Sequence, residues 1–170
     1  KGIMRSNVVI ERLPLAEDFN DEANKARFEA EAKFIRAYFY FILARNFGEV
    51  PLVDRVISTI EESRAPNSEP GEVWDLIESD LEFASENLPE SYDADNTGRA
   101  TRYAALSLLG KVEIYRAQWF GNDSKYSEAA DHLNEVVNSG MYTLVEDFGD
   151  NFSEETENNA ESVFEIQMTR

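Results

Sequence analysis

The sequence has no cysteine and a single histidine, His132. Without cysteine there is no disulfide framework, no thiol nucleophile and no cysteine-ligated metal site. One histidine excludes a poly-histidine metal site. His132 also lies between predicted core positions of a helix, where a surface or core-edge histidine is more typical than a catalytic base. These absences remove most cysteine- and histidine-dependent chemistry from consideration.

Basic residues are also scarce: the 170 residues contain 16 Lys and Arg against 34 Asp and Glu, a formal net charge of −18. This charge disfavours nucleic acid and anionic membranes as partners, because both require positive counter-charge. No run approaches the ~20 apolar residues that span a bilayer. The 42% hydrophobic and 12% aromatic content is nevertheless too high for a disordered acidic tail. We therefore expect one globular domain over residues 1–170.

Motifs that would indicate catalysis or cofactor binding are missing. There is no glycine-rich phosphate loop after a strand, no H-E-x-x-H and no EF-hand spacing. Paired carboxylates could hydrolyse glycosides, but nothing singles out one pair among so many acidic residues. The sequence predicts no cofactor and no metal site, and an all-helical glycosidase remains a remote alternative.

Apolar residues recur at helical spacing in five segments: residues 2–13, 21–47, 70–87, 102–119 and 125–139. Residues 34–44 are apolar almost all round, which is typical of a helix buried between neighbours. Gly48 and Pro51 follow that helix as its stop signals. Gly110 lies in the middle of a predicted helix, which indicates that a neighbouring helix approaches closely there.

The predicted helices form two pairs whose second members share a spacing. Trp74 is followed by apolar residues at +3, +7 and +10, and Tyr126 is followed by the same pattern. This is typical of tetratricopeptide hairpins, here with long inserted loops; two hairpins without repeat ancestry are the alternative. Residues 162–168 alternate like a short strand. The predicted fold is all-α, with a minor strand near the C-terminus.

Residues 30–53 read A-E-A-K-F-I-R-A-Y-F-Y-F-I-L-A-R-N-F-G-E-V-P-L-V. This stretch resembles the signature helix of the SusD/RagB family, the surface glycan-binding lipoproteins of the Bacteroidota outer membrane. Other stretches resemble the family in the same order along the chain: residues 3–9, 77–89, 100–105, 126–144 and 161–167. The resemblance covers nearly the whole chain.

The resemblance implies the helical part of a non-catalytic protein that binds an oligosaccharide or another nutrient. It also implies delivery to a SusC-like TonB-dependent transporter at the outer membrane. The implied lipid anchor is not in this chain, which we expect to be a piece of a longer protein. A generic helical-repeat scaffold that binds a protein partner is the alternative.

In this family the loop after the signature helix often contributes to the ligand site. Glycan sites combine aromatic faces with polar side chains that bind hydroxyl groups. Residues 53–69 contain no aromatic residue, so Asp54, Arg55 and Arg64 are the candidates there, with solvated loop charges as the alternative. Trp119 is the fourth candidate, and it could instead cap the core. Trp74, at a core spacing, is expected to pack between helices.

Overall fold

The computed structural model describes residues 1–16 and 21–167. The chain forms two compact units, unit 1 (Lys1–Leu88) and unit 2 (Pro89–Arg170). The described residues contain helices and no strand, which confirms the predicted all-α class. None of the described helices is long and apolar enough to cross a membrane. The expectation of one domain over residues 1–170 stays a prediction.

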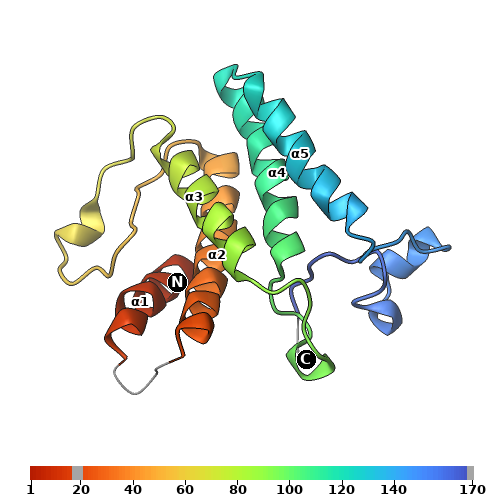
Figure 1. The fold of residues 1–170 in the computed structure, drawn as a ribbon. Coiled ribbons are helices and arrows are strands. Elements are labelled where there is room, and N and C mark those ends of the chain that lie inside the picture. The colour runs from red at the N-terminus through yellow and green to blue at the C-terminus, as the bar shows by residue number, and fades with distance from the viewer. Residues whose placement is uncertain (17–20, 168–170) are drawn as a thin grey trace. The chain divides into compact units, whose positions relative to one another are not determined.

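Unit 1 is built from α1 (Gly2–Arg12), α2 (Glu22–Phe47) and α3 (Glu72–Asn87). Helix α2 packs against both others and lies between them (Figure 1). It is buried on both sides because its second half is apolar nearly all round, as the sequence predicted. Trp74 of α3 is buried and packs edge-on against Phe41 of α2, with 6.1 Å between ring centroids. Trp74 is therefore a core residue.

The ends of these helices follow local signals. Asp21 caps α2, where its carboxylate accepts a hydrogen bond from the Asn24 backbone N–H at 3.1 Å. Gly48 ends α2 with a positive φ of 74°. Helix α3 begins at Glu72, two residues later than predicted, because Gly71 before it is left-handed (φ 95°) and cannot be part of the helix.

Unit 2 is a hairpin of α4 (Arg102–Phe120) and α5 (Ser124–Asn138), which lie side by side in Figure 1. Thr101 caps α4 by accepting a hydrogen bond from the Ala104 N–H at 3.1 Å. His132 Nδ1 of α5 lies 2.9 Å from Oε2 of the buried Glu113 of α4. The half-buried His132 thus occupies the edge of this core, as expected.

Short 3₁₀ helices occupy the connections: η1 (Leu13–Leu15), η2 (Glu62–Arg64), η3 (Ala94–Asn96), η4 (Phe148–Phe152) and η5 (Glu154–Thr156). The predicted strand over residues 162–168 is wrong for the described residues 162–167, and residue 168 lies outside them. A strand requires a ladder of backbone hydrogen bonds to a neighbour. Among the described residues, the segment after α5 and the segment before residue 162 share one backbone hydrogen bond, from the Thr143 N–H to the Ala160 carbonyl at 2.9 Å.

At Gly110, α5 approaches α4 closely. A Cβ placed on Gly110 would lie 2.7 Å from Cγ of Leu133 and 3.2 Å from the Ala129 carbonyl oxygen. The sequence predicted this close approach. The absence of a side chain at position 110 therefore sets the spacing of the hairpin.

Replacing Gly110 with alanine should lower the free energy of unfolding by about 1–2 kcal/mol, because overpacking outweighs the gain in helix propensity. The measurement is urea denaturation followed by circular dichroism. In a Leu133→Ala background the same change should cost less or become favourable, because the clashing side chain is gone. A Gly110→Ala chain that is more stable than the parent would contradict the steric role.

Candidate functional site

The loop between α2 and α3 carries three of the four predicted binding residues, and its base is closed. The Ser68 N–H donates to the Val50 carbonyl at 3.1 Å, which brings the two ends of the loop together. Residues 53–55 lie at the start of this closed loop. Their backbone is held by buried polar side chains from unit 1.

Arg36 of α2 is the centre of this buried network. Its Nε and Nη2 donate to the two carboxylate oxygens of Asp80 on α3, at 2.7 and 2.8 Å. Its Nη1 donates to the Asn7 side-chain oxygen at 2.9 Å and to the Asp54 carbonyl at 3.0 Å. Arg36 and Asp80 are 5% and 2% exposed. One guanidinium therefore joins three helices and the loop.

Asn7 of α1 and Tyr40 of α2 extend the network to the neighbouring residues. The Asn7 amide donates to the Val53 and Arg55 carbonyls, both at 2.9 Å. The Tyr40 hydroxyl accepts from the Val53 N–H at 2.6 Å and lies 3.0 Å from the Val53 carbonyl, to which it donates. Burial raises the pKa of Tyr40, so its hydroxyl keeps the proton that it donates. The backbone of residues 53–55 is thus fixed by side chains.

Burial acts against the charge on both members of the central pair. It raises the pKa of Asp80, against the hydrogen bonds from Arg36 that lower it. Burial also disfavours the charged form of Arg36, but the hydrogen bonds and charge of Asp80 prevail and raise the pKa of the guanidinium. Arg36 therefore stays charged, and Asp80 is its counter-ion.

The outer part of the loop is held by weaker, exposed contacts. The Glu62 carboxylate accepts from the Ser58 N–H at 2.7 Å and lies 3.7 Å from the Arg55 guanidinium. The backbone hydrogen bond from Ser58 lowers the pKa of Glu62. Contacts of this kind stabilise little at a solvated surface.

The structure places the predicted binding residues as follows. Asp54, Arg55 and Arg64 are all exposed on the loop, with Arg64 at the end of η2. Trp119 is 51% exposed near the end of α4, in unit 2. The first three therefore share one surface segment of unit 1, and Trp119 belongs to a different unit.

Two features of this region were missed from the sequence. The buried network of Asn7, Arg36, Tyr40 and Asp80 was not predicted, although a charged Arg36 within an apolar helix was a usable signal. Phe47, in the last turn of α2 beside the loop, is 72% exposed, the highest value among the large apolar residues described in unit 1. Phe47 is thus an exposed aromatic ring next to a loop that contains no aromatic residue. Among the described residues, no group of acidic or histidine side chains could hold a metal ion.

The described part of the chain is all-helical and carries a loop anchored by a buried network. Comparison with known families identifies the class of protein that has this fold. Residues 1–114 match a model of the SusD-like family whose description is "Starch-binding associating with outer membrane". The chain belongs to the SusD-like family, as the residues of the signature helix indicated. The family is associated with the outer membrane.

Particular relatives support this assignment. A SusD-like protein from Bacteroides ovatus is 30% identical over 150 residues, which cover 86% of this chain and 27% of the relative. A solved SusD superfamily protein from Parabacteroides distasonis matches with a TM-score of 0.89 and 30% identity, over 98% of this chain and 36% of that one. A laminarin-binding SusD-like protein matches with a TM-score of 0.82 and 32% identity, over 95% and 34%. The chain thus spans roughly a third or less of the length of these relatives.

Replacing Arg36 with methionine should lower the free energy of unfolding by about 3–5 kcal/mol, because it leaves the Asp80 carboxylate buried without its counter-charge. Urea denaturation measures the change. Arg45→Met, an exposed position on the same helix, is the matched control and should cost less than about 1 kcal/mol. The double variant Arg36→Met/Asp80→Leu should recover much of the loss, and a double variant no better than Arg36→Met would contradict this explanation.

The hydrogen bond that the Glu62 carboxylate accepts from the Ser58 N–H should make the structure of the loop depend on pH. Because the pKa of Glu62 is lowered from its ordinary 4.5, its hydrogen bonds stabilise the loop above that value and are lost as the pH falls through the lowered pKa. The Ser58 amide resonance in NMR spectra should therefore titrate with a midpoint below 4.5. Glu62→Gln should abolish this titration and Glu61→Gln should preserve it. A titration midpoint at or above the ordinary pKa of 4.5 would argue against this hydrogen bond.

Proposed function

We propose that this chain is part of a protein that binds glycans at the bacterial outer membrane without chemically changing them. Membership in the SusD-like family carries the proposal. The family description names starch, and a structural relative is described as laminarin-binding. Both are uncharged glucans, so a glucan is the first ligand to test.

The anchored loop supports binding by the predicted residues of unit 1. A binding site that is ordered before the ligand arrives avoids the entropic cost of ordering it. Buried side chains fix residues 53–55, while the side chains of Asp54 and Arg55 extend into solvent. We infer that Asp54, Arg55 and Arg64 bind sugar hydroxyls and that Phe47 offers a ring face. Trp119 is a further candidate on unit 2.

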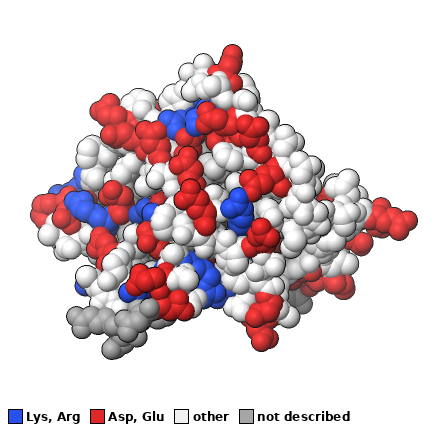
Figure 2. All heavy atoms as spheres, in the orientation of Figure 1, with Lys and Arg blue, Asp and Glu red and all other residues white. Residues whose placement is uncertain are grey.

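We further propose that the longer protein is lipid-anchored on the extracellular face and passes its ligand to a SusC-like TonB-dependent transporter. In this proposal both units together form one helical SusD-like domain. The charge distribution fits a partner other than nucleic acid, because acidic side chains outnumber basic ones over the face in Figure 2.

A helical scaffold for a protein partner is the second candidate function, and one observation favours it. A groove between α1 and α2, with a volume of about 760 Å³, is lined mainly by apolar side chains. Val9, Ile35 and Phe39 in this groove are 40%, 37% and 39% exposed. Exposed apolar surface of this kind often marks a protein interface.

Glycan binding can be tested by titrating the chain with oligosaccharides of laminarin and of starch in a calorimeter. Asp54→Ala, Arg55→Ala and Arg64→Ala should each weaken binding about fivefold, the effect of one lost hydrogen bond. Arg12→Ala, an exposed position outside the loop, is the control and should leave affinity unchanged. Absence of binding by the parent chain would refute the proposal, and release of shorter sugars would show an enzyme instead.

A further inference from the structure

Unit 2 contains a second pocket, remote in sequence from the loop of unit 1, and we propose that it binds the end of an uncharged oligosaccharide. Its volume is about 310 Å³, near the lower end of the range for small-molecule sites. Its walls come from three segments: residues 90–101, 141–142 and 158–165. This inference rests on the proposed glycan-binding function and adds a site that was not among the predicted residues.

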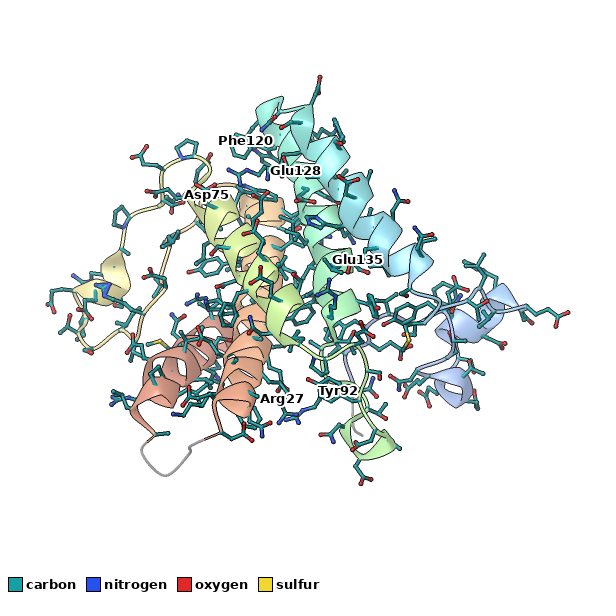
Figure 3. All side chains as sticks on the ribbon, viewed as in Figure 1. Arg27, Asp75, Tyr92, Phe120, Glu128 and Glu135 are labelled. Carbon is teal, nitrogen blue, oxygen red and sulfur yellow. The ribbon has the colours of Figure 1, made fainter. Side chains whose placement is uncertain are left out.

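The pocket walls are held in place by contacts within unit 2. Tyr142 packs edge-on against the buried Tyr103 of α4, with 6.1 Å between ring centroids. Arg99 donates to the Asn96 side-chain oxygen at 2.9 Å and lies 5.9 Å from the Tyr92 ring centroid. Tyr92 projects from the loop that follows α3 (Figure 3). These contacts indicate that the pocket exists before a ligand arrives.

The pocket wall formed by residues 158–165 is also held by hydrogen bonds and close packing. The Asn158 and Gln167 side-chain amides donate to each other, at 3.1 and 3.0 Å. The Asn158 backbone N–H donates to Oε1 of Glu165 at 3.0 Å. Gly98 lies against Gln167 so closely that a Cβ there would be 2.3 Å from its Cγ. The segment around Asn158 is therefore joined to the loop that carries Tyr92.

The lining has the mixed chemistry that a sugar requires. Three aromatic side chains, Tyr92, Tyr142 and Phe164, line the pocket together with polar groups that include Asn96 and Arg99. A sugar presents C–H faces to aromatic rings and hydroxyls to amides and guanidinium groups. The larger α1–α2 groove lacks this balance, and sugar hydroxyls buried in it would go largely without hydrogen bonds, at considerable cost.

Charge decides which sugars fit. Two carboxylates, Glu90 and Glu165, line the pocket against the single guanidinium of Arg99. The chain as a whole carries a net charge of −18. Sulfated sugars and uronic acids would be repelled by this field, whereas uncharged sugars would not. The pocket is therefore suited to uncharged sugar units and not to anionic ones.

The test is an NMR titration of the isotope-labelled full chain with laminarin oligosaccharides, and with alginate oligosaccharides as the anionic probe. The proposal predicts that laminarin oligosaccharides shift the Asn96 and Asn158 side-chain amide signals. Alginate oligosaccharides should leave both unchanged. Tyr92→Ala should weaken this binding about fivefold, as expected for loss of an aromatic anchor. Tyr126→Ala, which removes a 45% exposed ring from α5 outside the pocket, should have no effect.

The two proposals fail in different ways. Laminarin binding with shifts confined to residues 53–64 would overturn the pocket in unit 2 and leave the proposed function intact. Absence of any binding would overturn both. Binding of alginate to the pocket would overturn the assignment to uncharged sugars. If Tyr92→Ala alters the circular dichroism spectrum, Asn96→Ala takes its place, and unchanged binding by a folded Asn96→Ala chain would overturn the site.

Discussion

The arrangement of unit 1 depends on the ion pair between Arg36 and Asp80. The guanidinium of α2 lies where three helices and the start of the loop converge, and its three nitrogens donate to α1, α3 and the loop. Desolvating two charges is expensive, so the pair is tolerated only when nearly every polar atom has a partner. That requirement links the angle of α1, the packing of α3 and the path of residues 53–55. A change in any one of them would leave a buried charge without its hydrogen bonds.

Such a network contributes more to specifying the structure than to overall stability. An apolar core could hold α1, α2 and α3 together, but apolar contacts are not directional. The Asn7 amide and the Tyr40 hydroxyl fix individual backbone atoms of the loop, at 2.6–3.0 Å. The loop is therefore held at its base by part-buried hydrogen bonds, while its tip, beyond Ser58, depends on exposed contacts.

How much could be predicted from sequence follows from the range of each interaction. Helix periodicity involves residues a few positions apart, and the five helices predicted from it were confirmed. The strand near the C-terminus was wrong because alternation predicts a face, whereas a strand also needs a partner elsewhere in the chain. The network was missed for the same reason: Arg36 lies 44 positions from Asp80 and 29 from Asn7. Nothing local to Arg36 shows which residues it will meet.

The buried network and the exposed side chains of the loop place different constraints on the sequence. A laminarin-binding relative shares this backbone with a TM-score of 0.82 at only 32% identity. The helices must keep their apolar contacts and the buried pair, which constrains their sequences strongly. The exposed side chains of the loop bear no such constraint, because its path is set by bonds to backbone carbonyls and not by the identity of Asp54 or Arg55. The exposed side chains of the loop can therefore change without disturbing the network that holds its backbone.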